Sequence, residues 1–216
     1  MLILITHGRQ RSQRSETLIL RAVGRLLAKD GYAALSIEGV AREAGVGKAT
    51  IYRWWSGKAH LVLDYYCAAP SPVPTPDSGA LEPDLNTFLN DTFKALTSTH
   101  AGATMASLMA ESQTNPEFGA ELRERFISTR REALRSILQA GQKRREIAAD
   151  TDLDVTIDLL YGAMWYRLLN RHAPLDARFA TRLIRQILGG IRGSDAAPLS
   201  AILSFNRKES QHGEER

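Results

Sequence analysis

Cysteine is almost missing from this 216-residue chain, in which Cys67 is the only one. A single thiol excludes a disulfide within the chain and is typical of proteins from a reducing compartment. Long apolar runs are missing too. None approaches the about 20 residues that a transmembrane helix needs, and Leu2–Ile5 is shorter than the about 7–15 residues of a signal-peptide core. We therefore expect a soluble, cytoplasmic protein without a membrane span.

Patterns that would indicate strands or catalysis are also missing. No stretch alternates between apolar and polar residues, and no glycine-rich phosphate loop or nucleophile–base pair can be found. His60, His100 and His172 are far apart, without the spacing of metal ligands. The sequence therefore predicts no metal, no cofactor and no catalytic residue. With 44% hydrophobic and 24% charged residues, it also does not fit a wholly disordered chain.

Positive charge is concentrated in the first third of the chain. Residues 1–66 contain ten basic and five acidic residues, a net charge of +5, whereas the remainder contains 18 basic and 19 acidic residues, a net charge of −1. This asymmetry favours an anionic partner for the N-terminal part, either nucleic acid or a membrane surface. The alternative is a basic face that only water contacts.

Apolar residues recur at helical spacing along most of the chain, which predicts an all-α protein of about nine helices. A first helix is expected over Ser15–Lys29, with Gly31 as its stop. Four prolines within residues 70–76 predict a loop. We expect a DNA-binding domain at 12–60, a second domain at 61–193, and flexible tails at 1–11 and 194–216. The first ten residues fit either a DNA-contacting arm or a disordered leader, and we favour the leader.

Residues 36–58 predict a helix-turn-helix, two short helices joined at Gly45–Val46. Glycine suits this turn because the chain there needs a positive φ. If Ile51 and Trp55 form the buried side of the second helix, rotation of 100° per residue points Ala49 and Arg53 outward. This second helix would then lie in the DNA major groove, which admits an α-helix.

The outward side chains have the chemistry of DNA contacts. Arg53 can fork onto guanine, and the ammonium groups of Lys48 and Lys58 suit phosphate because they are point charges. The alternative for Arg53 is a solvent charge, and for Tyr52 packing on the neighbouring helix. The predicted DNA contacts are Ser36, Lys48, Ala49, Thr50, Tyr52, Arg53, Trp54 and Lys58.

Residues 36–62, SIEGVAREAGVGKATIYRWWSGKAHLV, resemble the N-terminal domain of the TetR (tetracycline repressor) family of bacterial regulators. The resemblance rests on Val40-Ala41, Ala44-Gly45-Val46, Thr50-Ile51-Tyr52 and Lys58, and it covers about residues 14–65. It implies an all-helical homodimer with a three-helix, homeodomain-like DNA-binding domain and a helical ligand-binding and dimerisation domain. The chain departs from the family at positions 52–55, where many members have Tyr-x-His-Phe. Trp55 takes the place of the core Phe, and the indole of Trp54 is expected to donate to phosphate.

The C-terminal half resembles the family only in general terms. The resemblance implies that the last two helices, near 152–171 and 176–192, pair in the homodimer. Candidates for a ligand pocket are the aromatic, Met and Thr side chains Phe88, Thr92, Met105, Met109, Phe126, Tyr161 and Trp165, which fit core packing equally well. Cys67 fits a small buried apolar residue better than a redox sensor.

Two functions are consistent with these features. The first is a transcriptional repressor that binds an inverted-repeat operator in double-stranded DNA as a dimer and is released by a small-molecule effector. The second is a helical small-molecule-binding enzyme with a vestigial helix-turn-helix. The absence of a catalytic motif favours the regulator.

Overall fold

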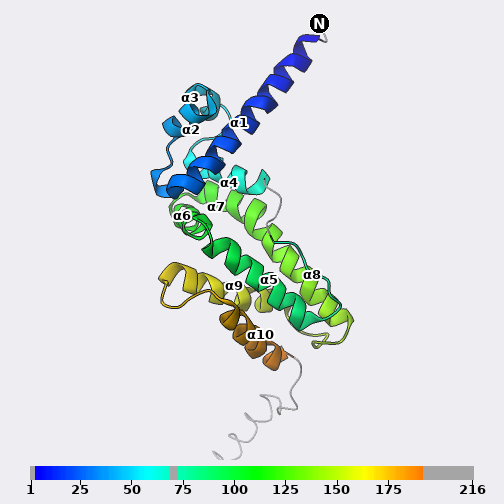
Figure 1. Ribbon diagram of the computed structural model, residues 1–216. Helices are drawn as coiled ribbons and strands as arrows, with labels where there is room; N and C mark the ends of the chain where they lie inside the picture. The colour runs from blue at the N-terminus through cyan, green and yellow to red at the C-terminus, as the bar shows by residue number, and fades with distance from the viewer. Residues whose placement is uncertain (1–2, 69–72, 192–216) are drawn as a thin grey trace, which may run out of the picture.

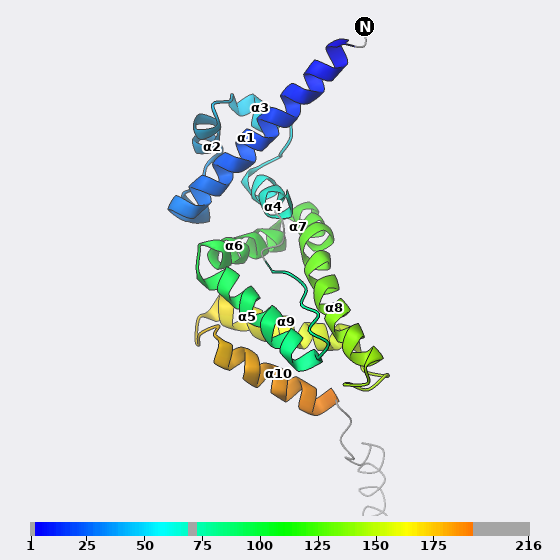
Figure 2. The same ribbon diagram turned by 45° about the vertical axis from the view of Figure 1, so that its right-hand side comes forward.

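The computed structural model describes the backbone of residues 3–68 and 73–191 and the side chains of residues 13–68 and 73–190 (Figures 1 and 2). Every regular element in those residues is helical. The elements are α1 (Ile3–Ala34), α2 (Ile37–Ala44), α3 (Lys48–Tyr52), α4 (Lys58–Ala68), α5 (Leu81–Thr97), α6 (Ala101–Thr114), α7 (Pro116–Leu122), the π-helical turn η1 (Arg123–Ile127), α8 (Ser128–Lys143), α9 (Leu153–Asn170) and α10 (Ala177–Ile191). Because α7, η1 and α8 run on without a break, these residues form nine continuous helices, and the all-α prediction is confirmed.

Helix α1 is longer than the sequence indicated. It begins at Ile3, whereas we predicted a start at Ser15 after a leader, so residues 3–11 of the predicted flexible segment 1–11 are helical (Figure 1). This segment has one glycine and no proline, and an existing helix extends at the cost of ordering one residue per new hydrogen bond. At the other end Gly31 interrupts the helix with φ 73° and ψ 178°, as predicted. The predicted tail at 194–216 lies outside the described residues.

Helices α1–α4 pack around one core, which continues into the second half of the chain. α1 contacts α2, α4 and α6, and α4 contacts α7 and η1. The buried residues of this first core are Ile19, Ala22, Val23, Leu27, Leu35, Ile37, Val40, Ala41, Ala44, Ile51, Trp55, Ala59, Leu61, Val62, Leu63, Met105, Leu108, Phe118 and Leu122. Helix α4 thus crosses the predicted domain boundary at 60–61. Its buried apolar side chains belong to a core that contains residues from both sides of this boundary.

The second core lies among α5, α8, α9 and α10, at the end of the molecule away from α2 and α3 (Figure 2). Two helices begin at side-chain caps. Asn115 accepts from the amide of Phe118 at the start of α7, in the first core, and Asp152 accepts from the amide of Val155 at the start of α9, each at 3.1 Å. Helix α5 begins at Leu81 and has Pro83 as its third residue. Proline is tolerated there because the first-turn amides have no partner within the helix.

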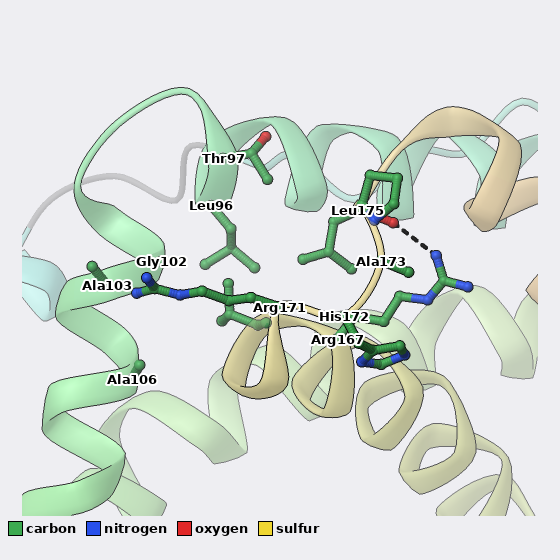
Figure 3. A pocket seen from close by; sticks show the side chains of 12 residues that line it. Leu96, Thr97, Gly102, Ala103, Ala106, Arg167, Arg171, His172, Ala173 and Leu175 are labelled. Carbon is green, nitrogen blue, oxygen red and sulfur yellow. Dashed lines mark hydrogen bonds between the residues drawn. The ribbon is translucent and has the colours of Figure 1, made fainter.

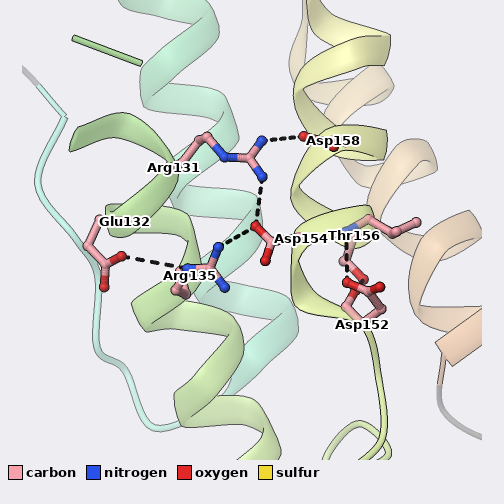
Figure 4. Close-up of polar contacts among 8 residues, drawn as sticks. Arg131, Glu132, Arg135, Asp152, Asp154, Thr156 and Asp158 are labelled. Carbon is pink, nitrogen blue, oxygen red and sulfur yellow. Dashed lines mark hydrogen bonds and ion pairs between the residues drawn. The ribbon is translucent and has the colours of Figure 1, made fainter. Parts of the chain in front are cut away.

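Ion pairs join α8 to α9 across their exposed edge (Figure 4). Arg131 pairs with Asp158 and, at 2.8 Å, with Asp154, which also accepts from Arg135. These two guanidinium groups lower the pKa of Asp154 through their hydrogen bonds. Along the described segments, no helix has the length and apolar composition to cross a membrane.

Candidate nucleic-acid interface

The helix-turn-helix of α2 and α3 is held by its caps and its turn. The Ser36 hydroxyl accepts from the amide of Gly39 at 3.0 Å, so this predicted DNA contact already caps α2. Gly45 has φ 68° and ψ 34°, and the amide of Val46 donates to Ala41 at 3.0 Å. Nothing lies within 4 Å of where a Cβ on Gly45 would be. The turn therefore needs glycine for its backbone conformation and not for lack of space.

Helix α3 presents the predicted side chains to solvent. Its α-helical residues end at Tyr52, not at Trp55 as we predicted, although the amides of residues 53–55 still donate to carbonyls of α3. Ile51 and Trp55 are buried, which fixes the rotation of the helix as expected. Lys48, Ala49, Tyr52 and Arg53 are exposed, and Thr50 and Trp54 are partly exposed. Contact of these side chains with DNA stays a prediction.

Two tryptophans support the end of α3. The rings of Trp54 and Trp55 stack with centroids 5.8 Å apart, and the Arg53 guanidinium lies 6.0 Å from the Trp54 centroid. The indole of Trp55 donates to Asp64 of α4 at 2.5 Å. Arg53 makes no ion pair with any described residue, so its charge is available to an anionic partner.

The two predicted phosphate lysines already have partners. Lys48 pairs with Glu38 of α2 at 3.1 Å, and both side chains are exposed. A backbone hydrogen bond and then Lys48 lower the pKa of Glu38. Lys58 donates to the backbone carbonyl of Tyr32 at 3.2 Å and lies 4.3 Å from the centroid of that ring. Sequence reasoning missed Glu38 and Tyr32, although both are in the sequence near the predicted interface.

A chain of polar contacts leads from α3 towards the second half of the molecule. Asp64, which accepts from Trp55, also pairs with Arg125 in η1 at 2.5 Å. Arg125 pairs in turn with Glu121 of α7, which lies 3.6 Å from His60 of α4. The π-helical turn η1 is thus the part of the long α7–α8 helix whose Arg125 forms an ion pair with Asp64 of α4. The turn was not predicted, because a single π-turn inside a helix has no characteristic residue of its own in this sequence.

The predicted pocket residues are divided between the two cores. Phe88 and Met105 are buried in different cores, and Trp165 packs against both cores. The Thr92 hydroxyl donates to the Phe88 carbonyl, and the Tyr161 hydroxyl donates to the backbone carbonyl of Arg130 at 2.9 Å. Burial raises the pKa of Tyr161 well above its usual value. Met109 and Phe126 are partly buried in the first core.

A cleft of about 530 Å³ opens elsewhere, beside the end of α9 (Figure 3). It is lined by residues from the facing ends of α5, α6 and α9 and from the loop before α10: Leu96, Thr97, Gly102, Ala103, Ala106, Arg167, Leu168, Arg171, His172, Ala173, Pro174 and Leu175. None of the seven predicted pocket residues is among them. The cleft was not predicted, because helix ends and small residues form it, whereas the predicted pocket consisted mainly of aromatic and Met side chains.

Comparison with known proteins finds matches over both halves of the chain. Residues 19–65 match the family described as bacterial regulatory proteins, tetR family, and residues 75–187 match the tetracyclin repressor-like C-terminal domain. The HTH-type transcriptional regulator YdeS of Bacillus subtilis (strain 168) is 32% identical over 88% of this chain and 96% of its own length.

Two further matches agree. The DNA-binding transcriptional repressor TetR of Mycobacteroides abscessus is 27% identical over 82% of this chain and 94% of its own length. The crystal structure of the TetR family transcription regulator SCO0332 superposes with a TM-score of 0.73 and 34% identity, over 82% of this chain and 98% of that one.

Proposed function

Because this chain belongs to the TetR family of bacterial regulatory proteins and is an HTH-type transcriptional regulator, we propose that it represses transcription by binding an inverted-repeat operator as a homodimer, and that a small-molecule effector releases it. The comparisons give no support to an enzyme with a vestigial helix-turn-helix. Its site of action would be the cytoplasm, where bacterial DNA lies.

The main observation in support of DNA binding is the exposed face of α3. Ile51 and Trp55 are buried and fix the helix, so Ala49 and Arg53 face outward. Small side chains allow the helix to approach base edges, and a guanidinium can fork onto guanine O6 and N7. We assign phosphate contacts to Lys48, Tyr52, Trp54 and Lys58, base contacts to Ala49, Thr50 and Arg53, and to Ser36 the cap of α2 together with a phosphate contact.

An exposed apolar stripe on α9 supports the dimer. Val155, Leu159, Tyr166 and Leu169 are 51–64% exposed, and their spacing places them on one side of the helix. Gly162 lies between them, and nothing is within 4 Å of where its Cβ would be. Apolar patches rimmed by charge mark protein contacts. We propose that α9 and α10 pair with their copies, as predicted for 152–171 and 176–192, in a self-complementary two-fold interface.

The proposal is tested by selecting bound duplexes from a random pool with the full chain at about 150 mM salt. The expected result is enrichment of an inverted repeat whose half-sites are about one helical turn apart, or a multiple of it. The double variant Lys48→Ala/Arg53→Ala should enrich nothing, whereas Lys94→Ala/Lys143→Ala, which removes two exposed lysines from α5 and α8, should enrich the same sites. A folded, dimeric wild-type chain that enriches no sequence would contradict the proposal.

A further inference from the structure

The cleft at the end of α9 has an unusual distribution of charge. Three of its lining residues are the basic Arg167, Arg171 and His172, and no acidic residue lines it. The C-terminus of a helix carries about half a negative charge. Two guanidinium groups exceed that partial charge, so the cleft presents a net positive charge to a ligand.

The two arginines differ in how they are held. Arg167 donates to the carbonyl of Pro174 at 2.8 Å, and its guanidinium lies 3.4 Å from the centroid of the Phe179 ring. Arg171 has neither an ion pair nor a side-chain hydrogen bond with the described residues, and Figure 3 shows it extended along the cleft towards Gly102 and Ala103 of α6. The guanidinium of Arg171 therefore has all its N–H donors available to a ligand. Arg167 instead holds the loop before α10 against α9 at one side of the cleft.

The rest of the cleft is apolar and firmly framed. Leu96, Ala106, Leu168 and Leu175 supply apolar lining beside the arginines. At Gly102 a Cβ would come within 2.6 Å of the Leu96 carbonyl oxygen, so the ends of α5 and α6 are in close contact. A volume of about 530 Å³ is in the range of sites for small organic molecules.

From this arrangement we propose that the α9-end cleft binds a small amphipathic carboxylate, with its anionic group on Arg171 and its apolar body against Leu96, Ala106 and Leu168. A guanidinium matches a carboxylate because two parallel N–H groups meet its two oxygens. The inference rests on the proposed function, since it assigns the chemical class of the effector.

The position of the cleft links it to the DNA-binding part. Gly102 and Ala103 form the first turn of α6, and His100 directly before it lies against Gly31 at the end of α1, where a Cβ would be 3.3 Å from the ring nitrogen Nδ1. A ligand that moves the start of α6 therefore acts on α1. Its effect on DNA affinity can be no larger than its difference in affinity between the two conformations.

Calorimetric titration of the full chain without DNA tests the proposal. The probes are octanoate, dodecanoate and 1-naphthoate, each compared with its neutral primary amide of the same shape. At least one carboxylate should bind at least tenfold more tightly than its amide. Arg171→Gln should remove that preference, and Ala106→Leu, which adds bulk to the lining, should weaken acid and amide alike. Arg21→Gln, at an exposed arginine of α1 outside the cleft, should bind as the wild type does.

The proposal is wrong if none of the three carboxylates binds, if acid and amide bind equally, or if Arg171→Gln keeps the preference for the acid. Circular dichroism confirms that each variant is folded. Because the titration contains no DNA, its result is independent of the duplex selection. Binding that depends on Arg171 in a chain that selects no duplex would overturn the proposed repressor and leave the cleft assignment standing.

Discussion

At the scale of single residues, the arrangement around Arg53 suits the base contact that we propose for this side chain. Its guanidinium lies 6.0 Å from the Trp54 centroid, and Trp54 is itself stacked on the buried Trp55. A cation near an indole face is attracted by the ring quadrupole, which restricts the conformations that the side chain samples. Less entropy is then lost when the guanidinium pairs with a base.

Arg53→Ala should weaken binding to the selected operator by about 1–3 kcal/mol and relax the preference at one base position. Fluorescence anisotropy with the operator and its single-base variants measures both effects. Arg42→Ala, at an exposed arginine of α2, removes the same charge and should keep the base preference. Unchanged specificity in Arg53→Ala would refute the base contact.

Lys58→Ala should weaken binding to every duplex alike and lower the salt slope by about one unit. Lys58 holds its ammonium between the Tyr32 carbonyl and ring, so thermal unfolding of the variant separates lost stability from lost DNA contact. Salt titration of binding to operator and to random duplex gives the slope. A loss confined to the operator would contradict a phosphate role.

Cys67 should react slowly with thiol reagents. The thiol is half-buried, and burial raises its pKa, with nearby Arg125 opposing the shift. A raised pKa leaves less thiolate at pH 8, and thiolate is the reactive form. The rate of reaction with dithionitrobenzoate, measured from pH 7 to 9, should lie below that of the chain unfolded in guanidinium. If the thiol of the native chain reacts faster than that of the unfolded chain, this prediction is wrong and the redox-sensor alternative is favoured instead.

At the scale of elements, local signals predicted most helices, and tertiary packing decided the exceptions. The helix-turn-helix of α2 and α3 was predicted because Gly45 and the apolar spacing on either side of it coincide there. The start of α1 and the π-turn η1 were missed because neither has a local signal. The predicted outward face of α3 agrees with the observed burial, since Ile51 and Trp55 determine it. The cleft was missed because residues distant in sequence form it.

Gly45→Ala should destabilise the chain by about 1–2 kcal/mol, because alanine at φ 68° brings its Cβ close to the following carbonyl. The matched control is Gly47→Ala in the same turn, at φ −75°, which should change stability by no more than about 0.5 kcal/mol. Neither Cβ would have a neighbour within 4 Å, so only backbone conformation differs. Urea unfolding measures both, and equal effects would exclude the backbone explanation.

At the scale of the whole molecule, the proposed dimer makes the distance between its two copies of α3 depend on how α9 pairs with its copy. Its exposed stripe of Val155, Leu159, Tyr166 and Leu169 has no covering element within the described residues. The ion pairs from Arg131 and Arg135 hold α9 to α8 at its charged edge. The apolar edge is therefore presented in a fixed orientation.

Leu159→Glu should convert the dimer to a monomer and reduce operator affinity, because a buried unpaired carboxylate opposes the interface. Sedimentation velocity measures the oligomeric state. Leu18→Glu is the matched control, since Leu18 is an exposed leucine of α1, at 41%, and should leave the mass unchanged. A Leu159→Glu chain that stays dimeric at micromolar concentration would contradict the proposal that α9 forms the dimer interface.

The continuity of the first core limits how these regulators can be recombined. The apolar faces of α1 and α4 close against Met105, Leu108, Phe118 and Leu122 of α6 and α7. A hybrid made by joining the DNA-reading segment of one relative to the sensing segment of another at the loop of residues 73–80 would bring together two faces that were not selected for each other. Voids or clashes there would cost several kcal/mol. A transplant intended to give a bacterium a new sensor should therefore carry its own α6 and α7 surface, or redesign it.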